Sequence, residues 1–214
     1  MYQDRRHAGE TLAAELAARR YEDISLFAVP RGGVLVAAPI AERLGVGIDI
    51  LVTRKIGHPA NPEVAIGAVM ADGAAVLDEA LIHTYAVPQE YLDRAIAREF
   101  AEIERRMVAY TGSAAIPDFT GRTAVIVDDG IATGYTIRAA IAWLKTLGPA
   151  KIVVAVPVAP PETVAEIAGD IDEIICPLQP AAFMAVGRHY RDFPQNSDEE
   201  VLAILRAVNK RSRS

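Results

Sequence analysis

Hydrophobic positions along the chain form two kinds of segment. Short runs of Val, Ile, Leu and Ala are followed by longer stretches in which apolar residues recur every three or four positions. The short runs are typical of buried parallel strands, and the longer pattern is typical of helices packed on them. This order predicts an α/β fold, with a central, mainly parallel sheet flanked by helices. Strands are expected over residues 25–30, 48–56, 123–129, 151–159 and 173–177, and helices over residues 7–21, 34–45, 136–148, 160–169 and 197–208.

The middle of the chain carries a different pattern. Glycine, proline and asparagine in residues 57–63 predict a loop, and residues 65–82 predict two short strands that turn at Asp72–Gly73. Residues 88–110 predict the longest helix, because apolar positions recur at spacings of four and three between charged ones. We expect this apolar stripe to pack in the core or against a second copy of the chain. Its members are Ile96, Phe100, Ile103, Met107 and Tyr110.

The length of 214 residues suits one domain with a sizeable core. No repeat, linker or low-complexity tract divides it. A further loop is expected over residues 112–121, and Ser197 with Glu200 has the spacing of a capping box at the start of the last helix. We therefore interpret residues 1–214 as a single domain.

Composition excludes several classes of protein. A net charge of -6 disfavours a nucleic-acid partner, because sequence-independent binding needs a basic face. The single cysteine, Cys176, excludes an internal disulfide and a cysteine-based zinc site, and we expect a buried thiol rather than a nucleophile. The N-terminus has no signal-peptide core, and no apolar run approaches ~18 residues, so we expect a cytoplasmic protein without a membrane partner.

Three predicted strands run directly into polar loops at residues 30–33, 53–63 and 128–136. In an open parallel sheet, ligands bind beyond the carboxyl ends of the strands. If these strands are parallel neighbours, the three loops meet at one edge of the sheet. We expect the functional site at that edge.

The third loop, in the stretch VIVDDGIATGYT, combines two opposite chemical features. Small residues at 130–134 let backbone N–H groups converge, Thr133 and Thr136 add hydroxyl groups, and a helix begins directly afterwards. Such a loop suits a phosphate monoester. Asp128 and Asp129 would repel that phosphate, so they are expected to face vicinal hydroxyls or a coordinated cation on the same ligand. A phosphorylated sugar meets both demands.

The acidic stretch also has a plainer interpretation. Taken alone, Asp128-Asp129-Gly130 fits a strand-to-loop transition in which an aspartate caps a helix. Four hydrophobic residues, two acids and Thr-Gly-x-Thr form a more specific combination. The chain has no Gly-x-Gly-x-x-Gly after a strand, no Gly-x4-Gly-Lys-Ser/Thr, no Gly-x-Ser-x-Gly and no His-Glu-x-x-His.

The stretch VIVDDGIATGYT resembles the ribose-phosphate signature of type I phosphoribosyltransferases. VPRGG resembles their pyrophosphate loop, and TRKIGHPANPE occupies the place of their flexible catalytic loop. The ending FMAVGRHYRDFPQNSDEEV resembles a narrower group of stand-alone bacterial members. The resemblance runs in consistent order over about residues 5 to 205. It implies a core over about residues 5–176, and a small C-terminal hood lobe with the last helix over about residues 177–210.

The resemblance implies roles for the acidic loop. Asp128 and Asp129 would hold the ribose 2′- and 3′-hydroxyls of phosphoribosyl pyrophosphate (PRPP) and take part in catalysis. Mg²⁺ is the implied cofactor, held near these aspartates mainly by PRPP, with no assured direct protein ligand. The residues implied to bind the 5′-phosphate are Ala132, Thr133, Gly134, Tyr135 and Thr136.

The first two loops are implied to serve the leaving group. Arg31, Gly32 and Gly33 would meet the pyrophosphate, and a non-proline cis peptide is expected at Arg31–Gly32. Arg31 is the main catalytic cation, because a guanidinium can grip phosphate oxygens bidentately. Arg54 is a second pyrophosphate contact and Lys55 a further catalytic residue, both at the entrance to a loop that could close over the substrate.

The acceptor is expected to be a nitrogenous base beneath the hood. Ala132 stands where hypoxanthine-guanine enzymes have an aspartate, which speaks against a 6-oxopurine. Tyr135 stands where the family commonly has a glycine. The candidate pocket residues are Ile131 as a floor and Phe183, Tyr190 and Phe193 as stacking rings, with packing inside the lobe as the alternative for the aromatics.

The leading interpretation is a Mg²⁺-dependent phosphoribosyltransferase. It would move ribose 5-phosphate from PRPP to a nitrogenous base and release pyrophosphate, and the resemblance implies a homodimer. One alternative is a non-catalytic sensor of PRPP or a nucleotide, and another is a hydrolase of a different phosphorylated sugar. The intact PRGG stretch and the basic second loop favour the transferase, because a sensor need not keep a clamp for the leaving group.

Overall fold

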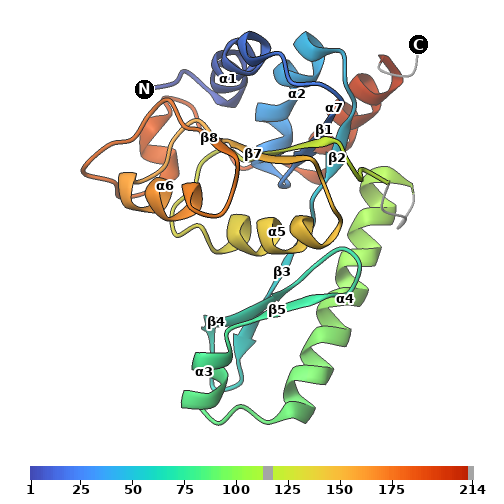
Figure 1. Ribbon diagram of the computed structural model, residues 1–214, viewed down its shortest axis with the longest axis vertical. Coiled ribbons are helices and arrows are strands. Elements are labelled where there is room, and N and C mark those ends of the chain that lie inside the picture. The colour runs from blue at the N-terminus through green and yellow to red at the C-terminus, as the bar shows by residue number, and fades with distance from the viewer. Residues whose placement is uncertain (113–117, 212–214) are drawn as a thin grey trace.

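The computed structural model describes residues 1–112 and 118–211, and its main body is an α/β domain (Figure 1). All strands of its central sheet are parallel and follow the order β2-β1-β6-β7-β8. The β-branched residues of the central strands are buried on both faces of the sheet; every residue of β6 is buried. The predicted fold class is confirmed. The strands are β1 (Ile24–Ala28), β2 (Ile48–Ile50), β6 (Thr123–Val127), β7 (Lys151–Ala155) and β8 (Glu173–Ile175).

Helices cover both faces of this sheet. In Figure 1, α1 and α2 lie above the sheet and α5 lies below it. The capping box predicted at the start of α7 is present, because the Glu200 N–H donates to Ser197 Oγ at 3.2 Å and the Ser197 N–H donates to Glu200 Oε2 at 3.0 Å. The helices of this body are α1 (Arg5–Arg19), α2 (Gly32–Leu44), α5 (Tyr135–Thr146), α6 (Pro161–Ala168) and α7 (Asp198–Arg211).

A second lobe projects from the main body (Figure 1). It contains an antiparallel sheet in the order β3-β4-β5 and the short helix α3. The long helix α4 runs from this lobe to the main body, so one element spans both parts. Its elements are β3 (Arg54–His58), β4 (Asn61–Val69), β5 (Ala75–Leu77), α3 (Glu79–Thr84) and α4 (Gln89–Thr111).

Two predictions for the segment that enters this lobe were wrong. Residues 48–56 are not one strand: β2 ends at Ile50, and the chain crosses to the other sheet. Leu51 and Val52 lie in the segment that connects the two sheets, and both are buried. The apolar run therefore continues although these residues belong to no strand. Residues 57–63 are not a loop, because β3 and β4 form a hairpin with irregular register near Gly57, and only two residues connect them.

Other predictions for this region held in part. The chain turns at Asp72–Gly73 as expected, and Gly73 has a φ of 84°. Residues 79–84 form α3, which the pattern did not predict. The predicted stripe on α4 faces inward: Ile103, Met107 and Tyr110 are buried, while Ile96 and Phe100 are half-buried against the core. Half of the loop predicted over residues 112–121, namely residues 113–117, lies outside the described residues.

The C-terminal stretch 177–196 has one short helical turn, η1 (Val186–His189), and otherwise irregular backbone. It packs on the N-terminus, where Tyr2 pairs with Tyr190 in a single parallel bridge. A small hydrophobic cluster forms there from Tyr2, Ala8, Val158 and Tyr190. That this C-terminal stretch forms a hood over an acceptor base stays a prediction.

Candidate phosphoribosyl site

The strand order brings together the three polar segments that follow β1, β2 and β6, the second of which leads into the β3–β4 hairpin. β1 is paired with β2 on one side and with β6 on the other, so the loops that follow these strands start side by side. At this edge the Val29 N–H donates to the Val127 carbonyl and the Leu51 N–H donates to the Ala28 carbonyl, both at 2.9 Å. The chain reverses its direction of winding between β1 and β6, which is where ligands bind in open α/β sheets.

The acidic pair lies directly against the glycines of the first loop. A Cβ added to Gly32 would sit 1.9 Å from Asp129 Oδ2. A Cβ added to Gly33 would sit 2.7 Å from the Val127 carbonyl oxygen. Real Cβ atoms essentially never approach that closely, so both positions require glycine. The pyrophosphate loop and the acidic loop therefore form one continuous surface.

Asp129 is held by a residue that no sequence pattern indicated. The Nε of Arg5, at the start of α1, donates to Asp129 Oδ2 at 2.8 Å, and the side chain of Arg5 is only 9% exposed. The Tyr190 hydroxyl donates to the backbone carbonyl of Asp129 at 2.6 Å. The Asp128 Oδ1 accepts a hydrogen bond from the Asp129 N–H at 2.8 Å. Side chains from two distant segments, together with a local hydrogen bond, thus fix the acidic pair.

The environment of the pair opposes full ionisation. Burial, together with the adjacent Asp129 carboxylate, raises the pKa of Asp128 well above its usual value. Burial also raises the pKa of Asp129, although the Arg5 guanidinium acts in the opposite direction. The two carboxylates are half-buried and their pKa values are raised. They are therefore suited to hydrogen bonding with hydroxyl groups, because a hydroxyl group is neutral and can either donate or accept a hydrogen bond.

The predicted phosphate loop leads into α5. Gly134 adopts a φ of 74°, in the left-handed region that favours glycine, and α5 begins at the next residue. The Thr163 hydroxyl donates to the Ala132 carbonyl at 3.2 Å and ties the loop to α6. Thr133 and Thr136 are exposed. The loop therefore offers hydroxyls, backbone groups and the positive end of a helix to an anion.

A cleft separates this loop from the hairpin lobe. One cavity of about 520 Å³ is lined by Thr53 and Lys55 on one side and by Thr133, Tyr135 and Thr136 on the other. The Tyr135 hydroxyl reaches across to Asp78 Oδ2 at 3.3 Å. The Trp143 indole N–H donates to Asp72 Oδ2 at 2.6 Å and makes a second link between α5 and the lobe.

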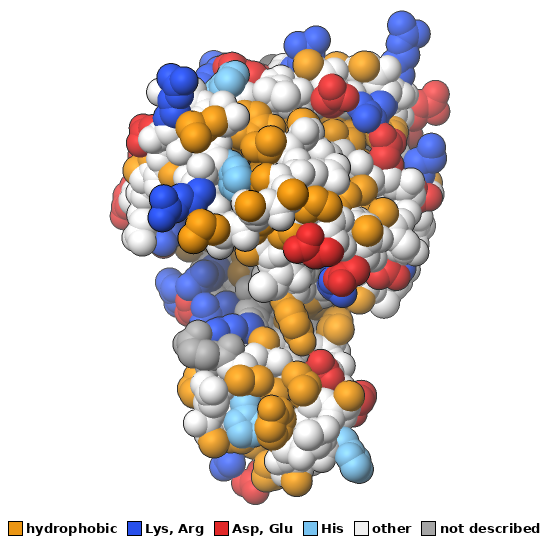
Figure 2. Space-filling model, turned by 90° about the vertical axis from the view of Figure 1, so that its left-hand side faces the viewer, with side chains coloured by type: hydrophobic (Ala, Val, Ile, Leu, Met, Phe, Trp, Pro, Cys, Tyr) orange, Lys and Arg blue, Asp and Glu red, His pale blue; other side chains and the backbone are white. Residues whose placement is uncertain are grey.

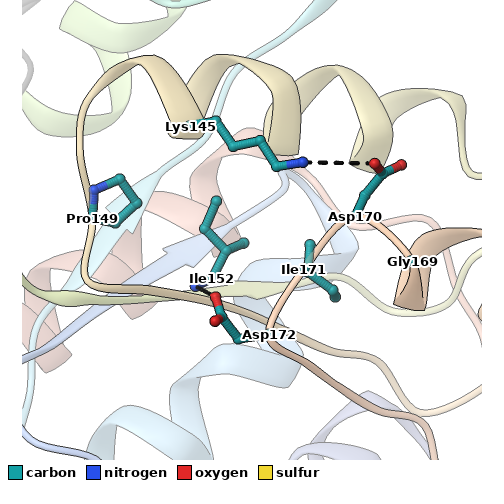
Figure 3. Close-up of a pocket in the computed structure, with 7 residues that line it drawn as sticks. All are labelled: Lys145, Pro149, Ile152, Gly169, Asp170, Ile171 and Asp172. Atoms are coloured by element: carbon teal, nitrogen blue, oxygen red, sulfur yellow. Dashed lines mark hydrogen bonds and ion pairs between the residues drawn. The ribbon is translucent and has the colours of Figure 1, made fainter.

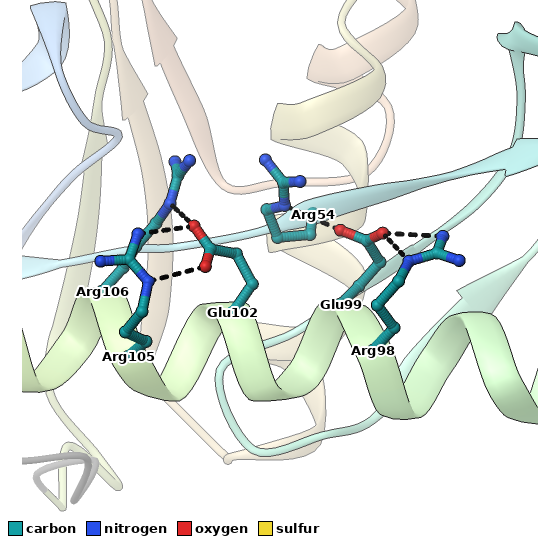
Figure 4. Close-up of polar contacts among 6 residues, drawn as sticks. All are labelled: Arg54, Arg98, Glu99, Glu102, Arg105 and Arg106. Atoms are coloured by element: carbon teal, nitrogen blue, oxygen red, sulfur yellow. Dashed lines mark hydrogen bonds and ion pairs between the residues drawn. The ribbon is translucent and has the colours of Figure 1, made fainter.

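The cations predicted for the leaving group lie on different elements. Arg31 is exposed at the start of α2, and the cis peptide joins Pro30 to Arg31, so the prediction of a cis bond at Arg31–Gly32 was wrong by one residue. Arg54 donates from Nε to Glu99 Oε2 on α4 at 2.9 Å (Figure 4). Glu99 also accepts from Arg98, so its buried carboxylate is shared.

Basic side chains gather at the waist of the molecule, between the main body and the hairpin lobe (Figure 2). On α4, Glu102 binds both Arg105 and Arg106 at 2.8 Å (Figure 4). All three side chains are partly exposed, and Arg105 is 66% exposed, so solvent screens these ion pairs and they contribute little to stability. Their combined positive field favours an anionic ligand entering the cleft, although the whole chain is acidic.

The residues predicted for a base pocket lie beside the acidic pair or in the C-terminal stretch. Ile131 is buried, and its N–H donates to the Val158 carbonyl at 2.9 Å. Phe183 stacks on His189, with ring centroids 5.4 Å apart. Tyr190 is buried, and Phe193 lies against it at 4.9 Å. Their use by an acceptor base stays a prediction.

Another hollow, of about 370 Å³, lies at the amino-terminal edge of the sheet (Figure 3). Asp172 Oδ2 accepts a hydrogen bond from the Ile152 N–H at 2.8 Å, and Lys145 pairs with Asp170 at 3.6 Å. Both acids follow α6: Asp172 joins this segment to the start of β7, and Asp170 joins it to α5. Because ligands bind at the opposite edge in such folds, we interpret these contacts as structural.

Comparison with known proteins identifies the family. The sequence profile of the phosphoribosyl transferase domain matches residues 4–189. This chain belongs to the phosphoribosyl transferase family. A Mycobacterium tuberculosis protein whose name places it among the phosphoribosyl transferases is 42% identical over 206 residues. That alignment covers 96% of this chain and 46% of the relative, so the chain spans about half the length of the curated relatives it matches.

Two solved structures resemble this phosphoribosyl transferase family member. The protein TT1426 from Thermus thermophilus is 41% identical, with a TM-score of 0.83, and the match covers 95% of this chain and 97% of that one. The AQ2163 protein from Aquifex aeolicus is 14% identical, with a TM-score of 0.51 over 82% of this chain and 73% of that one. The second likeness concerns the fold alone.

Neither a cluster of metal ligands nor a membrane-spanning helix is found in the described part of this family member. Across residues 1–112 and 118–211, no group of three His, Cys, Asp or Glu side chains is placed to hold a metal ion. Within the same ranges, no helix is both long enough and apolar enough to cross a bilayer.

Cys176 is not expected to act as a nucleophile in this family member. It is buried, and burial raises the pKa of its thiol to about 11. At pH 8 only about one thiol in a thousand would be ionised, against roughly a quarter for an ordinary cysteine. We expect iodoacetamide to label the native protein at least about a hundredfold more slowly than the urea-unfolded protein. Equal labelling rates would show that Cys176 is accessible and ionised.

Proposed function

We propose that this family member is a phosphoribosyltransferase that moves ribose 5-phosphate from PRPP to a nitrogenous base and releases pyrophosphate. The observation that carries the proposal is the convergence, at one edge of the sheet, of the loops after β1 and β6, with the β3–β4 hairpin across the cleft. An anion-binding loop, a carboxylate pair and an exposed arginine followed by two glycines match the 5′-phosphate, the ribose and the pyrophosphate of PRPP in chemistry.

Each part of the site has a chemical task. The loop at residues 132–136 would bind the 5′-phosphate through the start of α5. Asp128 and Asp129 would accept hydrogen bonds from the ribose hydroxyls and steady the positive charge that develops at C1′. Arg31 would stabilise the departing pyrophosphate. Lys55 lines the cleft opposite the phosphate loop, and closure of the hairpin would exclude water from the reacting centre.

Mg²⁺ fits this site as a companion of the substrate. PRPP would hold the ion mainly through its own phosphates and hydroxyls, and the carboxylates of Asp128 and Asp129 would lie near it. When bound, Mg²⁺ neutralises charge that builds up on the leaving pyrophosphate. The protein's own part is to orient the sugar with its carboxylates and to grip the pyrophosphate with Arg31.

The proposal is tested by pyrophosphate release from Mg²⁺-PRPP against a panel of purine and pyrimidine bases. Release that depends on one base would establish the transferase and identify its acceptor. PRPP binding without release for any base would replace the transferase with a sensor. Sugar-phosphate hydrolysis without a base requirement would replace it with a hydrolase.

Arg31→Ala is expected to weaken PRPP binding by about tenfold or more, because a charge-assisted contact to the pyrophosphate is lost. Isothermal titration calorimetry with Mg²⁺-PRPP measures this change. Arg94→Ala is a matched control, since Arg94 is an exposed arginine of α4 that pairs with Glu90 at 3.3 Å, one turn away on the same helix. Equal PRPP affinity in the Arg31 variant and the wild type would remove Arg31 from the pyrophosphate site.

A further inference from the structure

The N-terminal residues meet residues 189–194 of the C-terminal stretch beside the acidic pair. Three backbone hydrogen bonds of 2.9 Å join residues 2–3 to residues 189–192. The Tyr2 hydroxyl also donates to the Pro157 carbonyl at 3.0 Å. We call residues 2–5 together with residues 189–194 the terminal clasp. The clasp brings segments nearly 190 residues apart in sequence into contact with the end of β6.

Arg5 connects the clasp to the acidic pair. Its Nε donates to Asp129 Oδ2 and its Nη1 donates to the Pro194 carbonyl, both at 2.8 Å. Its guanidinium lies 3.7 Å from the centre of the Phe193 ring, within the range of a cation–π contact. One side chain from the start of α1 therefore contacts both the residue pair after β6 and the C-terminal stretch.

The burial of Arg5 sets it apart from its neighbour in sequence. The Arg6 side chain is 62% exposed and pairs with Glu42 at 3.3 Å, where solvent screens the charge. Arg5 is almost fully covered and pairs with a carboxylate that is itself mostly covered. Removing such an ion pair from water costs free energy, and the attraction between the charges gives little net stability in return. The contact with Arg5 instead restricts the orientation of the Asp129 carboxylate.

We propose that Arg5 is a positioning residue for the ribose-diol site, and that it holds the Asp129 carboxylate against Gly32 in the orientation that receives the sugar. This inference rests on the proposed function. Arg5 need not touch the substrate, because it acts through Asp129. The clasp keeps Arg5 in place through Pro194 and Phe193, so the C-terminal stretch contributes to sugar binding from outside the pocket.

Two aromatic residues support the acidic pair in the same arrangement. Tyr190 donates its hydroxyl to the Asp129 carbonyl, and Phe193 covers the guanidinium of Arg5. Both rings are already packed against protein groups. They support the acidic pair in this arrangement, whereas Phe183 contacts only the neighbouring His189 ring among the described aromatic pairs.

The inference is tested by the preference for ribose 5-phosphate over 2-deoxyribose 5-phosphate, measured by calorimetry. The wild type and the control Arg6→Gln should share one preference. Arg5→Gln should bind ribose 5-phosphate about tenfold more weakly and lose most of the preference, because Asp129 is no longer held. Arg5→Lys should be intermediate, since an ammonium can reach only one of the two acceptors, and it carries the test if Arg5→Gln fails to fold.

A double variant separates positioning from general loosening. If Arg5 acts through Asp129, then Arg5→Gln combined with Asp129→Asn should bind ribose 5-phosphate no more weakly than Asp129→Asn alone. Additive losses would overturn the inference, as would an equal loss of affinity for both sugars or an unchanged preference in Arg5→Gln. A wild type that binds neither sugar phosphate would instead refute the proposed function, and the role of Arg5 with it.

Discussion

Replacing Asp129 with asparagine is expected to lower PRPP-dependent pyrophosphate release by at least about tenfold. Asparagine keeps the shape of the side chain and an oxygen that can accept from Arg5, but it loses the negative charge that steadies the sugar at C1′. The nearly buried Arg5 would lose its anionic partner, so we also expect a decrease of roughly 1–2 kcal/mol in the free energy of unfolding. Steady-state assays and urea unfolding curves measure the two effects separately.

The matched control for this variant is Asp170→Asn. Asp170 lies at the opposite edge of the sheet and pairs with Lys145 in solvent, so this change should leave turnover within about twofold of wild type. Turnover of Asp129→Asn equal to wild type, in protein shown to be folded, would end the assignment of Asp129 to the diol site.

Gly32→Ala is expected to reduce activity by about a hundredfold, because its Cβ would meet Asp129 Oδ2 at 1.9 Å and Asp129 Cγ at 2.5 Å. Something must move, and Asp129 is short and already held by Arg5. The methyl group would therefore displace either the carboxylate or the pyrophosphate loop. We expect the same variant to lose roughly 1–3 kcal/mol of stability through this overpacking.

Gly169→Ala provides the comparison for that substitution. Gly169 follows α6 with a φ of −69°, and its nearest neighbour to an added Cβ is the Glu166 carbonyl oxygen at 3.7 Å. An ordinary side chain fits there, so activity and stability should stay close to wild type. Wild-type activity in Gly32→Ala would mean that the two loops can separate without loss of the site.

The local sequence pattern was sufficient for most of the main body. Apolar runs such as Val125–Val127 predicted strands because a parallel strand buried on both faces must be apolar throughout. The adjoining Asp128 and Asp129 could be recognised as exceptional because charges rarely follow such a run. The segments after β1, β2 and β6 could be expected to meet because parallel strands place their carboxyl ends on one edge.

The same reasoning failed at the hairpin lobe. Leu51 and Val52 extend an apolar run although the sheet ends at Ile50, because burial alone, without strand pairing, is enough to require apolar side chains. Pro62 lies within β4, where an irregular register accommodates it, so a residue that usually marks a loop misled the prediction. Burial and pairing are separate requirements, and hydropathy reports only burial.

The sequence by itself determined the α/β class, the order of the strands and helices in the main body, and the chemistry carried by the loops after β1 and β6. These follow from short-range periodicity and from residue types at adjacent positions. Only the tertiary structure decided that Arg5 binds Asp129, 124 residues away, and that Gly32 lies beneath the same carboxylate. Such contacts depend on how distant elements pack together, and no local pattern of polar and apolar residues encodes which arginine reaches which acid.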